Sequence, residues 1–292
     1  MRLFVNITLS GVANGMIFAS VALALVLIFR ATNIVNFAQS AMAMMTTFIA
    51  YSVLNRGNGY WVAFAVALAC GFVLGAVVQL VLIRPVQNKP PLNAVIVTFG
   101  LLILLEGIAG AIWGNTNRGF PAAFSQTGIT IGTTKVAFSH FDVFIVVAVV
   151  VLMVLMLVLF RATTLGLRMR ASAFASEIAR ILGVRVQRLL TLGWALAAVA
   201  GSLAGLLVAP TSSFSPYYMD LILVYAFTAA VIGGLDSPIG ALVGGLITGL
   251  ALAYVGGYLG GALEPLSALV LLIVTLMIRP EGLFSRPTAR RV

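Results

Sequence analysis

Polar side chains inside otherwise apolar segments are the residues of this sequence that could do chemistry. Four of them, Asn33, Asn36, Gln39 and Ser40, fall within eight residues at the entrance to an apolar stretch. Polar side chains at bilayer depth are costly, so each is a candidate functional residue. Two interpretations are open: a broken or re-entrant helix around a polar cavity, or a cap, with Asn33 or Asn36 capping the helix that follows.

Two further polar positions are candidates for a translocation pathway. Glu106 lies well inside an apolar stretch, where it either lines a pathway or is a structural acid bonded to a neighbouring helix. Asp236 and Ser237 follow Gly233 and Gly234 and repeat the theme of a polar break before an apolar run. Either side chain could also cap the next helix, with Pro238 in its first turn.

Residues for catalysis or metal binding are not expected. The lone His140 has no Ser, Cys or carboxylate partner at a recognisable spacing. The single cysteine, Cys70, cannot form an internal disulfide or a zinc framework. No G-x-x-x-x-G-K-[ST] phosphate loop occurs, so the chain is not expected to hydrolyse ATP itself.

The composition identifies the elements that must position these residues. Of 292 residues, 62% are apolar and 8% are charged, which excludes a soluble globule. A span needs roughly 20 mostly apolar residues. We therefore predict an all-α polytopic transmembrane helical bundle of about eight to nine spans, as one domain over 1–292. The nine candidate segments are 9–29, 35–54, 61–83, 93–113, 142–160, 190–209, 219–235, 239–258 and 262–279.

The net charge of +10 is read as an orientation signal rather than as a nucleic-acid footprint. The loop 161–189 carries six arginines against one acid and must be cytoplasmic if short basic loops stay inside. Counting spans from it places thirteen of the seventeen Lys and Arg residues, and the C-terminus, on the cytoplasmic side. The N-terminus is then outside, unless the segment 35–54 re-enters instead of crossing.

Glycines four residues apart predict close helix packing, because small residues let helix backbones approach in lipid. Gly201 with Gly205 and Gly240 with Gly244 are the pairs that we single out for packing. The same spacing recurs at Gly11/Gly15, Gly71/Gly75, Gly245/Gly249 and Gly256/Gly260.

The cytoplasmic loop 161–189 contains a predicted short amphipathic helix over residues 171–182. Its apolar residues Phe174, Ile178, Ile181 and Leu182 recur at i, i+4, i+7 and i+8, on one helix face. Gly183 follows, where a glycine can end a helix in the left-handed conformation. Such a helix lies on anionic lipid, connects two spans, or inserts into a groove of a soluble partner.

The outer stretches are expected to face the other side of the membrane. Residues 114–141 are expected to form an ordered exterior loop. In 210–220, Phe214, Tyr217 and Tyr218 are expected near an interface as part of an aromatic belt.

Four stretches resemble one known family. RASAFASEIARILGV, within the cytoplasmic loop, looks like the coupling segment of bacterial ABC importer permeases, and more closely like that of branched-chain amino acid (Liv-type, hydrophobic amino acid uptake) permeases. GMIFASVALALVLIFRATNIVNFAQSAMAMM, AVIGGLDSPIGALVGG and LVLLIVTLMIRPEGLF carry the same resemblance, in the expected order. It includes the Asn33–Ser40 cluster and so favours the cavity interpretation there.

The resemblance implies a permease subunit, not an enzyme, in a bacterial inner (cytoplasmic) membrane. It implies a second permease, identical or different, two cytoplasmic ATPase subunits that bind ATP and Mg, and an external substrate-binding protein. Membrane lipid surrounds the chain. The coupling helix would comprise Phe174, Glu177, Ile178, Ala179, Arg180, Ile181, Leu182 and Gly183. Two alternatives stay open: a self-contained secondary transporter or channel that uses Glu106, and the same importer class carrying urea or amides.

Overall fold

The computed structural model describes residues 2–87, 89–131, 134–174 and 176–284. Two long helices form the centre of the bundle, α1 (Arg2–Thr32) and α8 (Val186–Val208). The second half of α1 is almost entirely buried, as is most of α8 from Gly193 onward. Both helices are rich in small and aliphatic residues, which pack on every side without leaving a polar face.

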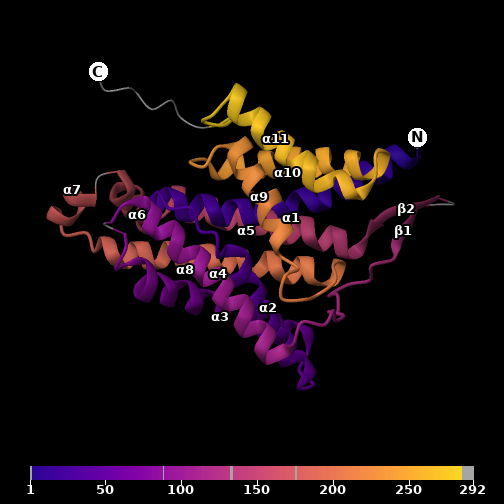
Figure 1. The fold of residues 1–292 in the computed structure, drawn as a ribbon, viewed down its shortest axis with the longest axis horizontal. Coiled ribbons are helices and arrows are strands. Elements are labelled where there is room, and N and C mark those ends of the chain that lie inside the picture. Colours follow the sequence, from indigo (N-terminus) through magenta and orange to yellow (C-terminus); the bar gives the residue numbers. More distant parts are fainter. Residues whose placement is uncertain (1, 88, 132–133, 175, 285–292) are drawn as a thin grey trace.

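The remaining long helices surround this centre (Figure 1). Within the described residues, seven helical stretches are long and apolar enough to cross a membrane, which confirms the prediction of a polytopic all-α bundle. They comprise α1, α3 (Tyr60–Val78) with the π-helical η1 (Gln79–Ile83), α4 (Pro91–Trp113), α5 (His140–Ala162), α8 with η2 (Ala209–Thr211), α10 (Pro238–Tyr258), and η3 (Gly261–Leu263) with α11 (Glu264–Ile278).

Two of the nine predicted segments form shorter helices. α2 (Gln39–Asn55) has 17 residues and α9 (Asp220–Gly233) has 14. α2 follows the non-helical stretch 33–38, which takes up residues 35–38 of the predicted segment, whereas the stretch 212–219 before α9 overlaps its predicted segment only at residue 219. The helices within 35–54 and 219–235 are therefore shorter than predicted, and the bundle is consistent with about eight to nine spans.

The two ends of the bundle differ in structure (Figure 1). At one end lie α6 (Thr164–Phe174) and α7 (Ser176–Ile181). The N-terminal end of α1 lies at the other end, near an unexpected antiparallel hairpin of β1 (Gly128–Ile131) and β2 (Thr134–Ser139) within the loop 114–141. The backbone N–H of Ala137 donates to the Asn6 side chain over 3.1 Å, which ties the hairpin to α1.

Glycines hold α10 against two different helices. A Cβ at Gly245 would lie 2.7 Å from Ala19 Cα, and Gly249 faces Gly15 and Gly11, so this side of α10 packs on α1. Gly240 and Gly244 face Gly233 and Ala229 of α9 instead.

The other glycine pairs do not all behave alike. Gly71 and Gly75 of α3 face α8, while Gly201 and Gly205 of α8 face α2. The expectation for Gly256/Gly260 is wrong, because α10 ends at Tyr258 and Gly260 adopts φ +111° in the following turn. Small residues on both sides of α8 and α10 therefore bring the neighbouring backbones into contact.

We predict that Gly245→Ala destabilises the protein by about 1–3 kcal/mol, because the added methyl group collides with the α1 backbone. Gly107→Ala on α4 is the matched control, since nothing lies within 4 Å of a Cβ there. Alanine should gain up to about 1 kcal/mol at that control site through helix propensity. Thermal unfolding of the detergent-solubilised chain measures both, and equal shifts would contradict the close approach of α1 and α10.

Candidate functional site

The break between α1 and α2 is the first feature of the candidate site. Asn33 ends α1 with φ +55°, the one described non-glycine residue with a positive φ. Its backbone N–H donates to the carbonyl oxygen of Phe29 over 2.7 Å, and its side chain is exposed. The chain then runs without helical structure to Gln39, so the predicted broken helix is present in the fold.

Two buried amides hold this break against α8. Asn36 Nδ2 donates to Gln39 Oε1 over 3.1 Å, and Gln39 Nε2 donates to the carbonyl oxygen of Ala197 over 3.1 Å. Asn36 and Gln39 are fully buried. Ala197 lies halfway along the 23 residues of α8, so the break reaches the middle of the bundle.

The capping interpretation is only partly met. Ala38 occupies the N-cap position of α2 and makes no side-chain cap bond. Asn36 Oδ1 accepts from the backbone N–H of Ala38 over 3.1 Å, one residue ahead of the helix. The hydroxyl of Ser40 is fully buried and has no hydrogen-bond partner among the described residues.

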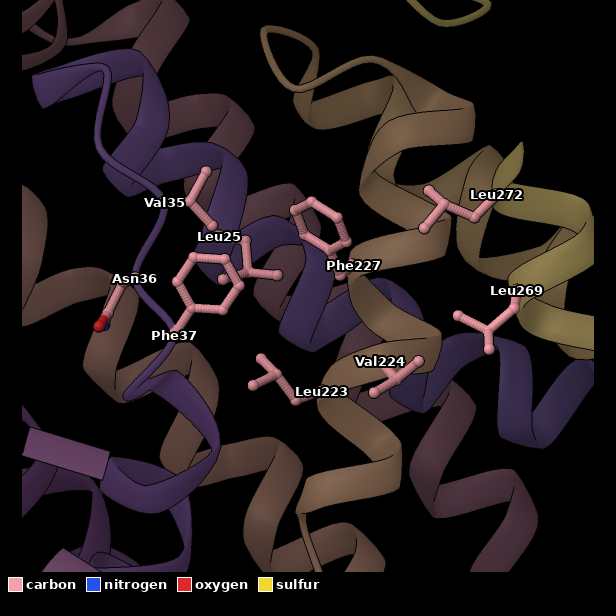
Figure 2. A pocket seen from close by; sticks show the side chains of 9 residues that line it. All are labelled: Leu25, Val35, Asn36, Phe37, Leu223, Val224, Phe227, Leu269 and Leu272. Atoms are coloured by element: carbon pink, nitrogen blue, oxygen red, sulfur yellow. The ribbon is translucent and has the colours of Figure 1, made fainter. Parts of the chain in front are cut away.

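An apolar cavity of about 190 Å³ lies beside this break. Figure 2 shows the rings of Phe37 and Phe227 next to each other in its wall, with ring centroids 6.2 Å apart, while the amide of Asn36 points away. Its walls come from α1, from the stretch 35–37, from α9 and from α11. The lining residues are Leu25, Val35, Asn36, Phe37, Leu223, Val224, Phe227, Leu269 and Leu272. The prediction that the amide cluster lines a polar cavity is therefore wrong. The amides of Asn36 and Gln39 bond to protein groups, and the cavity beside them is lined by apolar side chains.

The second polar break lies at the start of α10. Ser237 Oγ accepts from the backbone N–H of Gly240 over 2.9 Å, and Pro238 is in the first turn. Ser237 therefore caps α10, one of the two interpretations of the sequence, while Asp236 is exposed. The structure does not bring either residue to the cavity.

The C-terminal segment closes the end of α9 beside this break. The backbone N–H of Leu283 donates to the carbonyl oxygen of Ile232 over 2.8 Å, and that of Phe284 to Gly233 over 3.1 Å. Gly282 adopts φ +84° next to Gly234, a conformation and a contact that favour glycine. The segment after α11 thus satisfies carbonyl groups at the end of α9.

Glu106 is half-buried on α4, away from the lining of the cavity. Its carboxyl group interacts with that of Asp220 at the start of α9. Its Oε1 atom is buried and has no hydrogen-bond partner among the described residues. A contact with a neighbouring helix was one of the two roles considered for Glu106, and the partner is another acid.

The predicted coupling segment projects at one end of the bundle (Figure 1). Ile178, Ile181 and Leu182 are 61%, 85% and 76% exposed, so no described part of the chain covers their apolar side chains. Ala179 is buried and Arg180 is exposed. The side chains of Phe174 and Glu177 lie outside the described residues.

The limits of the helix in this segment differ from the prediction of 171–182. Helical structure begins earlier, at Thr164 in α6, and α7 ends at Ile181. Gly183 has φ +79°, its N–H donates to Arg180, and the N–H of Val184 donates to Ala179 over 2.9 Å. This pair of bonds is a Schellman motif, so Gly183 ends the helix in the left-handed conformation that the sequence indicated.

The aromatic residues of 210–220 are more buried than a belt requires. Phe214 is fully buried and packs against Phe48, Phe120 and Tyr218. The hydroxyl of Tyr218 donates to Gly205 over 3.0 Å, and only Tyr217 is exposed. The expectation of an interfacial belt is thus wrong for Phe214 and Tyr218, because the chain folds back after η2 and buries them against α2 and α8.

The walls of the cavity, apart from Asn36, were not among the candidate residues that the sequence indicated. Phe37, Leu223 and Phe227 read as ordinary apolar positions, since nothing in their type distinguishes a cavity wall from a packed core. The spacing of Leu223, Val224 and Phe227 at i, i+1 and i+4 places them on one face of α9. It does not indicate which element or cavity lies opposite that face. In the described part of the chain, no three His, Cys, Asp or Glu residues gather where a metal ion could bind.

Several branched-chain amino acid permeases are similar to this chain over almost all of its length. The LivH branched-chain amino acid permease of Salmonella typhimurium is 25% identical, over 99% of this chain and 98% of the relative. Escherichia coli K12 LivH is 26% identical with the same coverage, and Pseudomonas aeruginosa BraD is 26% identical over 97% and 96%.

A solved structure and a family model complete the comparison. PsaBC from Streptococcus pneumoniae, solved in complex with Fab, is similar in fold with a TM-score of 0.51 and 14% identity, over 96% of this chain and 93% of that one. The family described as branched-chain amino acid transport system / permease component matches residues 7–278. This multi-pass membrane protein therefore belongs to the family of branched-chain amino acid transport system permease components.

Proposed function

We propose that the chain is the permease subunit of an ATP-driven ABC importer for branched-chain or other hydrophobic amino acids. The family match and the names of the relatives support this cargo class. One structural observation supports this proposal best. The apolar side chains of Ile178, Ile181 and Leu182, on α7 and just after it, are exposed. Uncovered apolar side chains on a projecting helix fit a partner with an apolar groove.

The chemistry of ATP hydrolysis would then belong to partner subunits. Two cytoplasmic ATPase subunits would bind ATP and Mg and would receive α7. A second permease, identical or different, would complete the pathway, and a substrate-binding protein would dock outside, near the hairpin in the loop 114–141. The chain would lie in the bacterial inner membrane, with α6, α7 and the C-terminus in the cytoplasm.

Transport would follow alternating access, in which ATP binding changes the relative stability of two permease conformations. Closure of the ATPase subunits can do this only if they bind one conformation more tightly than the other. Because α7 is joined to α8 through the Gly183 turn, a displacement of α7 would act on the central helix. The permease itself would perform no chemistry.

The contacts of the predicted pathway residues separate those that position helices from Glu106, which is considered as an ion-linked site. Asn36 and Gln39 bond to each other and to α8, and Ser237 caps α10, so these side chains position helices rather than meet cargo. Glu106 carries the alternative of a self-contained secondary transporter. Uptake by this chain alone under an ion gradient would favour that alternative, and ATP-dependent uptake that needs the partner proteins would exclude it.

We predict that Ile178→Asp abolishes most ATP-driven uptake, because it places a charge where an apolar contact with the ATPase would form. Uptake should fall about tenfold or more, since the loss of an interface hot-spot residue costs about 2 kcal/mol or more. ATP hydrolysis by the assembled complex and the amount of the chain in the membrane are measured in parallel. Leu259→Asp, an exposed apolar position in the turn after α10, is the control. Unchanged uptake with Ile178→Asp would contradict the coupling role.

The positioning role of the amides predicts a loss of stability. Gln39→Leu should lower the free energy of unfolding by about 1–3 kcal/mol, because Asn36 and the Ala197 carbonyl oxygen lose a buried partner. Gln126→Leu is the control, since Gln126 makes a similar bond to Pro210 at an exposed site, where about 0.5 kcal/mol or less is expected. Thermal unfolding in detergent measures both variants. Equal losses of stability would contradict the role of the buried Gln39 side chain in holding the break against α8.

A further inference from the structure

We propose that the apolar cavity between residues 35–37, α9 and α11 receives the side chain of the transported amino acid partway through its passage. The cavity would accept an aliphatic side chain or a single aromatic ring and reject a charged one. The inference rests on the proposed function, because it assigns a place to the cargo of that importer. No residue of the cavity except Asn36 was a pathway candidate from the sequence.

The depth of the cavity fits a site reached from either side. Residues 35–37 lead directly into Gln39, which bonds to the middle of α8. The lining residues of α11, Leu269 and Leu272, lie within that helix, and those of α9 run from its first turn at Leu223 to Phe227 near its middle. Transporter sites commonly lie near the bilayer midplane beside interrupted helices.

The size and the chemistry of the cavity fit a hydrophobic side chain. An apolar cavity of about 150 Å³ in another protein binds benzene, a group of six carbons. The present cavity, at about 190 Å³, is partly open, since Val224 and Leu269 are 37% and 48% exposed, and it has room for a branched aliphatic side chain or one ring. Eight of its nine lining residues are apolar, and the amide of the ninth, Asn36, is used by Gln39 and Ala38.

The backbone beside the cavity argues against lipid as its occupant. Among the described residues, no protein group accepts a hydrogen bond from the backbone N–H of Val35 or of Phe37. Non-helical backbone at this depth is tolerated where it is buried in protein or lines a water-filled space, not where it faces lipid. Water or the polar part of an amino acid can satisfy such donors, whereas an acyl chain cannot.

A cysteine accessibility experiment tests the proposal in the complete importer, reconstituted in proteoliposomes and supplied with ATP. The chain has one cysteine, so Cys70→Ala gives the background in a single step. Leu223→Cys places a thiol on the cavity wall. Val154→Cys places one on an exposed apolar position of α5 as the control. The probe is a charged, membrane-impermeant methanethiosulfonate, and isoleucine is the protecting cargo.

The thiol at position 223 should react about tenfold faster than the thiol at 154, because a thiolate forms in water and not in hydrocarbon. Saturating isoleucine should slow the reaction at 223 by about fivefold or more and leave 154 unchanged. An unreactive thiol at 223 would overturn the proposal, since lipid or a second permease would then fill the cavity. A fast reaction that isoleucine does not slow would overturn it as well.

A filling variant provides an independent measurement. Leu223→Trp should reduce ATP-driven isoleucine uptake by about tenfold at an equal amount of the chain in the membrane, because the larger ring occupies the space for cargo. Val154→Trp should leave uptake unchanged. If the unsubstituted complex shows no ATP-driven uptake, the proposed function fails. If that uptake is normal but both 223 variants behave like their 154 controls, only the cavity assignment fails.

Discussion

The requirement that every backbone polar group at bilayer depth find a partner governs this structure. α1 stops at Asn33 and the chain continues without helical structure to the middle of the bundle. Such a break is viable only where protein or water satisfies the freed groups. Asn36 supplies an acceptor for the Ala38 N–H, and Gln39 links Asn36 to the carbonyl oxygen of Ala197. The two amides thus stabilise the break and leave an apolar cavity beside it.

Close packing of glycines makes this arrangement possible. Gln39 reaches the α8 backbone because Gly201 presents no side chain there, and Gly205 lets α2 and Tyr218 approach in the same way. α10 carries two glycine faces, one against α1 and one against α9. Apolar burial provides little drive for helix association in lipid. The close approaches therefore stabilise the bundle through van der Waals contacts and interhelical hydrogen bonds. The glycines and the amides therefore form one packing system.

The sequence predicts the helical class, most spans, the break after Asn33 and the helix end at Gly183, because hydropathy, polar clusters and glycine caps are local signals. It does not predict the hairpin in 128–139 or the buried position of Phe214, since both depend on a loop folding back against distant helices. The cavity could not be predicted from the sequence either. Phe37 and Phe227 lie 190 residues apart, and a phenylalanine in a cavity wall cannot be told from one in a packed core by its type. Local patterns specify elements, whereas the spaces between elements depend on how they pack.

The two helical walls of the cavity that come from the second half of the chain are joined at one end. Leu283 and Phe284 follow α11 and bond to the last turn of α9, next to the left-handed Gly282. α9 and α11 also pack directly against each other around the cavity (Figure 2). A motion that kept those bonds would carry both walls together. The cavity would then open or close as α9 and α11 moved against the stretch 35–37. The hydrogen bonds of Asn36 and Gln39 hold that stretch to α8. α10 would limit this displacement, because one of its glycine faces packs on α9 and the other packs on α1.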